Sequence, residues 1–132
     1  MEFLPLLEQR ACRILQPDTG HMGGITGLKR LARIADDYYL TIAPHCCWGP
    51  IRSMASAHVC TTIPNLLIQE NTKVGSNVYG ETVVGGYEFD PQYIDIPKAP
   101  AIGIHLWPEF IKEHKIDPAE RGVEWLKERA AL

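Results

Sequence analysis

The sequence predicts an α/β fold in which short parallel strands alternate with helices. Three apolar segments, residues 12–16, 40–43 and 66–69, each stop at a proline or a charged residue. Between them lie two segments, 25–38 and 51–62, whose apolar residues recur at helical spacing. Continuous apolar runs are typical of strands in a parallel sheet that is covered on both faces. The order therefore predicts a βαβαβ unit with right-handed connections and a sheet covered on both faces.

Length and composition indicate one ordinary globular domain. The chain has 132 residues, of which 45% are hydrophobic and 22% charged, and its net charge is −3. That balance lacks the basic excess of a nucleic-acid-binding protein or of a protein that binds anionic membranes. Charges or prolines interrupt every apolar stretch before the roughly 18 residues that a membrane span needs. The first residues lack the basic region of a secretory signal, so we expect a cytoplasmic protein without nucleic-acid or membrane partners.

The first third of the chain is expected to supply a helix end, a strand and a long helix. Residues 2–10 have the composition of a helix end, although Pro5 weakens that prediction. Pro17 and Asp18 stop the first strand, and a glycine-rich loop follows. From Ile25 onward, apolar side chains recur every three or four residues while basic residues occupy the other face, which is typical of an amphipathic helix.

The same alternation continues through the middle of the chain. The strand at residues 40–43 is stopped by Pro44. Pro50 suits the first turn of the next helix, because proline lacks only an N–H that has no partner there. Pro64 breaks that helix, and the third strand ends at Glu70.

Beyond Glu70 the pattern changes, and we divide the chain there. Residues 1–70 hold the βαβαβ unit, and residues 71–132 form an irregular tail whose first part, 71–86, is rich in Gly, Asn, Thr and Val. The tail is expected to contain a long loop at 71–86, a pair of short strands at 93–96 and 102–106, and a helix at 118–131.

Polar residues close all three expected strands, and we regard them as the candidate catalytic residues: Asp18, His45 and Glu70. In parallel α/β folds the functional site lies at the carboxyl ends of the strands. Neighbouring strands lie roughly 4.8 Å apart, so Asp18 can bond one ring nitrogen of His45 and leave the other for a substrate. An imidazole held in this way suits general acid or base catalysis near neutral pH. Each residue alone could cap a strand end; three in phase favour a site.

Other candidates carry weaker signals. His21 and Trp48 follow the first and second strand ends and are candidates for substrate binding, with loop packing as the alternative for each. The four cysteines include no C-x-x-C pair, so free thiols are expected. Neighbours along a strand point to opposite faces, so we expect no metal site formed by His45, Cys46 and Cys47.

Several short motifs resemble a known family when they are taken together. Residues 14–51 read ILQPDTGHMGGITGLKRLARIADDYYLTIAPHCCWGPI, and residues 63–70 read IPNLLIQE. The pieces QPD, HMGGIT, APHC, GPI, PN and IQE, in this order, resemble the mandelate racemase and muconate-lactonizing group of the enolase superfamily. Within that group the sequence most resembles sugar-acid dehydratases of the galactonate dehydratase type. The resemblance runs from Ile14 to Glu70 and more loosely to Leu106.

This resemblance implies that the three strands are the sixth, seventh and eighth of a TIM-type (β/α)8 barrel. Strand order tests the implication, because an open three-layer sheet, the alternative, need not keep sequence neighbours adjacent. Asp18 and His45 match the His–Asp dyad of the family, whose histidine is the expected acid for departure of the β-hydroxyl. Glu70 matches the acid that stabilises the enolate through the substrate carboxylate. Such enzymes use magnesium to stabilise an enediolate and form a 2-keto-3-deoxy acid.

The chain also departs from the family pattern. The family's magnesium ligands end the third, fourth and fifth strands, which would precede Met1, and we find no acid set here that replaces them. We therefore expect the carboxyl-terminal part of a dehydratase, inactive alone. Its partners would be a sugar-acid substrate and the missing barrel half or identical chains, since the family is usually homo-oligomeric. A non-catalytic remnant or interaction module, and a racemase or cycloisomerase, are the alternatives.

Overall fold

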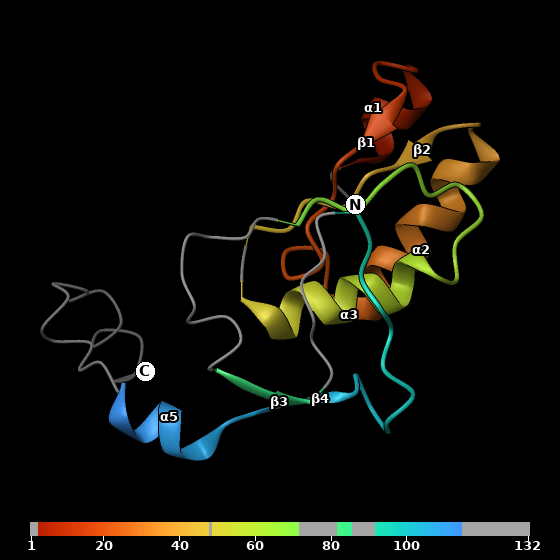
Figure 1. The fold of residues 1–132 in the computed structure, drawn as a ribbon. Helices are drawn as coiled ribbons and strands as arrows, with labels where there is room; N and C mark the ends of the chain where they lie inside the picture. The colour runs from red at the N-terminus through yellow and green to blue at the C-terminus, as the bar shows by residue number, and fades with distance from the viewer. Residues whose placement is uncertain (1–2, 48, 72–81, 86–91, 115–132) are drawn as a thin grey trace, which may run out of the picture.

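A computed structural model describes residues 3–47, 49–71, 82–85 and 92–114 of the chain (Figure 1). The elements, in chain order, are α1 (Leu4–Glu8), β1 (Ile14–Leu15), α2 (Gly24–Asp37), β2 (Thr41–Ile42), α3 (Pro50–Cys60), β3 (Val83–Gly85), β4 (Ile104–Leu106) and α5 (Pro108–Glu113). The three helices predicted in the first half of the chain are thus present, close to their expected bounds. Among the described residues, no helix combines the length and the apolar character needed to cross a membrane.

The parallel sheet keeps the strands in sequence order. β1 and β2 pair in parallel, with Leu15 opposite Ile42. The third expected strand runs beside β2 but is reduced to one parallel bridge, between Ile42 and Leu66. Further along, the Glu70 N–H donates to the carbonyl of Pro44 at 3.0 Å. Neighbours in sequence are therefore neighbours in space, as a barrel requires, and the expected order of the three segments is confirmed.

One buried amide joins the sheet to the helix layer. Asn65 Nδ2 donates to the carbonyl of Ala32 at 3.0 Å and to that of Leu40 at 2.9 Å. The backbone carbonyl of Asn65 accepts the N–H of Ile42 at 2.9 Å. The end of α2, the start of β2 and the third segment thus meet at one side chain.

α2 packs its apolar stripe against one face of the sheet. The helix begins at Gly23 and Gly24, whose φ angles of 80° and 77° lie in the left-handed region that favours glycine. The buried stripe packs with both strands in the larger hydrophobic cluster, which includes Leu15, Leu28, Leu31, Ala32, Ala35 and Ile42. Burial of each large aliphatic side chain contributes about 1.5–3 kcal/mol, so this layer fixes the sheet that carries the strand ends.

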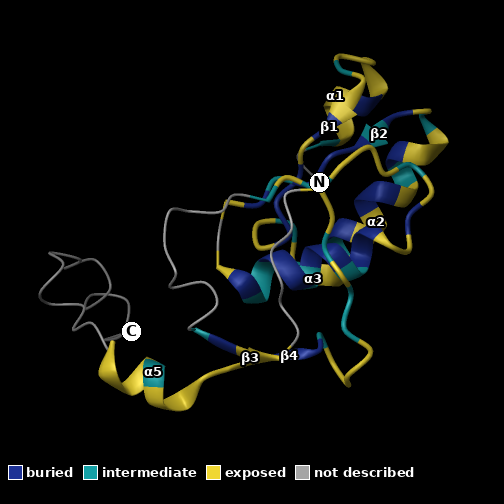
Figure 2. Cartoon of the chain, in the orientation of Figure 1, coloured by how far each residue is buried: buried dark blue, intermediate teal, exposed yellow. Residues whose placement is uncertain are grey.

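The other face of the sheet is open in the described part of the chain (Figure 2). Ile14 is 46% exposed and Leu67 55%, whereas Leu15 and Ile42 are buried. Successive residues of a strand point to opposite faces, so β1 has a covered side at Leu15 and an open side at Ile14. The expectation of a sheet covered on both faces is therefore wrong for these residues. The physical reason is that a barrel strand buries its inner face against other strands, not against helices.

The tail pairs differently from the prediction. β3 and β4 form an antiparallel pair, with Val84 opposite His105. Residues 83–85 are therefore a strand where a loop was expected, and the predicted strand at 93–96 is wrong. The alternation in that segment has another cause: Ile94 and Ile96 pack against the smaller hydrophobic cluster without joining a sheet.

The smaller cluster attaches the tail to the helix layer. Val83 and Ile104 are buried against Met54 and Ala57 of α3. α5, which the sequence did not predict, begins with Pro108 in its first turn and has no buried residue. The helix predicted at 118–131 lies outside the described residues.

Candidate active site

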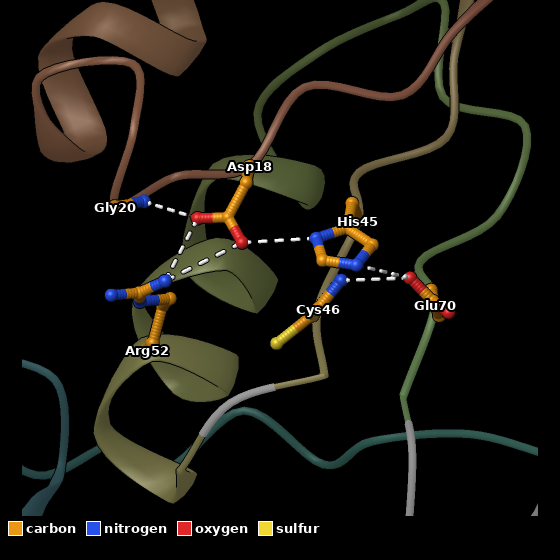
Figure 3. Close-up of polar contacts among 6 residues, drawn as sticks. All are labelled: Asp18, Gly20, His45, Cys46, Arg52 and Glu70. Carbon is orange, nitrogen blue, oxygen red and sulfur yellow. Dashed lines mark hydrogen bonds and ion pairs between the residues drawn. The ribbon is translucent and has the colours of Figure 1, made fainter.

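The carboxyl ends of the three parallel segments meet at one place (Figure 3). Asp18 and His45 form an isolated parallel bridge beyond the ends of β1 and β2. The His45 N–H donates to the carbonyl of Pro17 at 3.1 Å, and the backbone of Glu70 bonds that of Pro44. Backbone pairing therefore sets the position of all three candidate catalytic side chains, and the structure brings them together as the sequence predicts.

Asp18 and His45 are joined directly. His45 Nδ1 lies 3.0 Å from Asp18 Oδ2, and the Asp18 side chain is only 5% exposed. The other carboxylate oxygen accepts the Gly20 N–H at 2.7 Å. An ionised carboxylate only accepts hydrogen bonds, so the Nδ1 of the ring carries the proton that it donates to Asp18. This bond fixes the tautomer and leaves Nε2 as the nitrogen available for proton transfer.

Glu70 lies on the Nε2 side of the ring. Its Oε2 is 3.7 Å from His45 Nε2 and accepts the Cys46 N–H at 3.0 Å. The side chains of His45 and Glu70 are 40% and 44% exposed, so this side of the dyad faces solvent in the described structure. A reacting group placed here would contact the imidazole and the carboxylate together.

The backbone around Glu70 is held by its neighbour in sequence. Gln69 Nε2 donates to the carbonyl of Ser53 at 3.1 Å, and Gln69 Oε1 accepts the thiol of Cys60 at 3.3 Å. Burial raises the pKa of Cys60 to about 11, which keeps the thiol protonated and able to donate. The third segment is thereby fixed to α3 just before the carboxylate.

Arg52 also contacts this site, and the sequence analysis did not identify it. Its Nη1 lies 3.2 Å from Asp18 Oδ1 and 3.4 Å from Oδ2. The residue lies in the first turn of α3, the helix that follows the His45 strand end. It contacts the end of β1 rather than the end of β2 directly before α3, so its place in the sequence carries no signal for this contact.

Of the two candidate substrate-binding residues, the structure describes His21 but not Trp48. His21 is exposed in the turn after Asp18, and its N–H donates to the Asp18 carbonyl at 3.0 Å. In the described residues the ion-pair partners of the His45 ring are Asp18 and Glu70, so the dyad does not include His21. Trp48 lies outside the described residues.

Metal and thiol chemistry are limited in the described part of the chain. No group of three or more His, Cys, Asp or Glu side chains there could hold a metal ion. The four cysteines are free, and Cys46 and Cys60 are buried. A cavity of about 490 Å³ borders Glu70, but it opens between the third segment and α3, beside Ala57 and Cys60. His45 does not line that cavity, so the cavity is separate from the proton-transfer side of the dyad.

The chain matches a family model and two curated relatives. Residues 1–110 match the family model described as enolase C-terminal domain-like. The chain is 31% identical over 112 residues to a D-xylonate dehydratase of Haloferax volcanii, covering 85% of this chain and 27% of the relative. It is 31% identical over 131 residues to a D-galactonate dehydratase of Ralstonia pickettii, covering 94% of this chain and 34% of the relative. The chain thus spans about a third or less of the length of these relatives.

Solved structures have the same fold. A mandelate racemase/muconate lactonizing enzyme from Sulfitobacter sp. superposes with a TM-score of 0.78 at 31% identity, over 86% of this chain and 28% of that protein. An enolase from Pantoea ananatis, solved with bound D-gluconate and magnesium, gives a TM-score of 0.77 at 25% identity, over 85% of this chain and 27% of that protein.

Proposed function

Because the chain belongs to the enolase C-terminal domain-like family, we propose that it forms the carboxyl-terminal part of the active site of a sugar-acid dehydratase. The observation that carries the proposal is the Asp18–His45 pair, held at 3.0 Å by two adjacent parallel strand ends. Its relatives named as dehydratases of D-xylonate and D-galactonate support the reaction class. We take residues 1–70 as the barrel part and residues 71–132 as the tail that follows it.

The reaction that fits is β-elimination of water from a sugar acid. A base removes the proton α to the carboxylate, and the electron pair forms a carbon–carbon double bond as the β-hydroxyl leaves. His45 Nε2 gives its proton to that hydroxyl, so the leaving group departs as water. The enol that remains tautomerises to a 2-keto-3-deoxy acid. A positioned general acid contributes about 10²–10⁴-fold to such a step.

The roles of the three residues follow from their contacts. Asp18 keeps the ring in one orientation and stabilises the imidazolium before proton transfer, because it is buried and accepts from Nδ1. Glu70 faces the same space as His45 Nε2. We propose that it stabilises the enolate through the carboxylate of the substrate. We also propose His21 and Trp48 as substrate contacts, on the basis of their sequence positions alone.

Magnesium belongs to the proposal only for the complete site. The relative with bound D-gluconate and magnesium supports a metal requirement in the family. The described residues do not fit a magnesium site, since they lack a cluster of three potential ligands. Oxygen ligands for magnesium would therefore come from elsewhere in the complete active site, and the chain alone is proposed to be inactive.

The test is a dehydration assay of the complete active site, in which the chain is combined with the missing barrel half, with a panel of sugar acids, magnesium and detection of the 2-keto-3-deoxy product. His45→Asn should reduce turnover by about 10³-fold or more, and Asp18→Asn by a smaller but large factor, with unchanged circular dichroism. The exposed α2 residue Arg30 supplies the control, because Arg30→Met should retain full activity. Full turnover in His45→Asn would contradict the assignment. Racemisation without loss of water would favour the racemase alternative.

A further inference from the structure

Arg52 shares the carboxylate that orients the dyad histidine. Its Nη1 contacts both oxygens of Asp18, at 3.2 and 3.4 Å, while Oδ2 also accepts from His45 Nδ1 at 3.0 Å. The Asp18 side chain is 5% exposed and that of Arg52 31%, so the contact is mostly shielded from solvent. One buried anion therefore serves two groups, the imidazole and the guanidinium (Figure 3).

Gly20 leaves the space that the guanidinium occupies. A Cβ at this position would lie 2.6 Å from Arg52 Nε and 2.7 Å from Nη2, which is closer than atoms in contact can approach. The same glycine donates its N–H to Asp18 Oδ1 at 2.7 Å. The turn after β1 is thus shaped to place a cation and a backbone donor on one carboxylate.

The charges around His45 oppose one another. Asp18 faces Nδ1 at 3.0 Å and Glu70 faces Nε2 at 3.7 Å, and both anions favour the protonated ring. Arg52, on the far side of Asp18, neutralises part of that attraction because it competes for the same carboxylate.

We propose that Arg52 is a positioning residue of the dyad, which fixes the Asp18 carboxylate and makes His45 a readier proton donor. Its effect on proton release is independent of the substrate; its catalytic consequence rests on the dehydratase function proposed above. In this role Arg52 does not contact the reacting atoms; it acts through Asp18.

The experiment follows the ring signals of His45 by NMR during a pH titration, in the histidine-labelled protein as its gene encodes it. Arg52→Met should move the midpoint of the His45 titration to higher pH, because the cation that shares Asp18 is lost. Arg52→Lys keeps the charge and should restore most of the native midpoint. Arg30→Met, which removes an exposed cation from α2, should leave the midpoint unchanged.

A second variant removes the contact without removing a charge. Gly20→Ala displaces the flexible end of Arg52 and keeps the backbone N–H, so its midpoint should move in the same direction as that of Arg52→Met. If Arg52→Met does not fold, the titration of Gly20→Ala alone tests whether Arg52 acts on His45 through Asp18. Midpoints of Arg52→Met and Gly20→Ala that equal the native one would overturn the proposal.

The catalytic consequence has its own readout. In the dehydration assay, Arg52→Met should lower kcat several-fold with little change in KM, and the pH profile should shift with the NMR midpoint. A complete active site that dehydrates no sugar acid would contradict the proposed function, while the NMR titration would still decide the role of Arg52.

Discussion

The two faces of the parallel sheet carry similar aliphatic side chains in different surroundings. On the helix side, Leu15 and Ile42 are buried in the larger cluster beneath α2. On the other side, Ile14 and Leu67 are 46% and 55% exposed in the described structure. Exposed aliphatic side chains of this kind suit a second apolar layer, and neighbouring barrel strands would provide one. The comparison teaches that α2 buries one side of the strands, while the other side leaves aliphatic side chains exposed in the described residues.

The largest expected effect is a difference in stability between matched substitutions on the two sides. Ile42→Ala should lower the free energy of unfolding by about 2–5 kcal/mol, because it leaves a cavity under α2. Ile14→Ala, the same change on the paired strand, should cost less than about 1 kcal/mol since that side chain is half exposed. Urea denaturation of both variants measures the difference. Equal losses would mean that the two sides are equally buried in solution.

A pH titration next tests the buried contact between α3 and the third segment. The pKa of Cys60 is raised from 9.0 to about 11 by burial, so the folded state holds this proton more tightly than the unfolded chain. Its stabilising contribution is full below pH 9 and is lost as the pH rises toward 11, up to about 3 kcal/mol in all. Urea denaturation between pH 8 and 11 measures the decline. Cys60→Ala should flatten that decline, and a slope unchanged by the substitution would assign it to other groups.

Self-association tests the open side. Residues 1–132 expressed alone should associate or aggregate, because exposed aliphatic side chains and unpaired strand edges favour contact between copies. Leu67→Lys should shift the chain toward the monomer at the same concentration, by about tenfold in the apparent dissociation constant. Analytical ultracentrifugation measures both, with Tyr39→Lys as the control at a residue that is 94% exposed and lies elsewhere on the surface. If the unaltered chain is a monomer that unfolds in one sharp cooperative transition, this interpretation of the open side is wrong.

The smallest effect is an expected absence of metal binding by the chain alone. Asp18 is engaged by Arg52 and His45, and Glu70 by the Cys46 N–H, so their oxygens do not form the octahedral set that magnesium prefers. Calorimetric titration should show no stoichiometric magnesium uptake tighter than millimolar. A saturable one-to-one isotherm in the micromolar range would mean that the chain has a magnesium site that these two carboxylates do not explain.

The dyad and the strand order could be predicted from sequence because each depends on a local signal. Apolar runs mark the strands, and a polar residue directly after each run marks the strand end, which is why Asp18, His45 and Glu70 were found. Arg52 could not be found in this way, because its contact with Asp18 depends on the space that Gly20 leaves in a distant loop. A single arginine in a helix carries no pattern that distinguishes it from a solvated one.

The tail was predicted less well for a related reason. Alternating apolar residues at 93–96 are equally compatible with a strand and with an irregular segment that packs two isoleucines inward. Burial of Val83 and Ile104 against α3 sets the pairing of β3 with β4. The short, glycine-rich sequence around β3 does not indicate this burial. Short strands in irregular regions are decided by tertiary contacts more than by their own sequence.

The buried amide of Asn65 also bears on how the chain reaches this structure. Its two side-chain bonds close loops of 33 and 25 residues, and the loop-closure entropy must be lost before either bond forms. Contacts of such long sequence separation slow folding, and they form only when α2, β2 and the third segment are already together. We therefore expect the bonds of Asn65 to form late in folding. In chains whose third segment has not yet paired with β2, Glu70 would not yet lie beside His45.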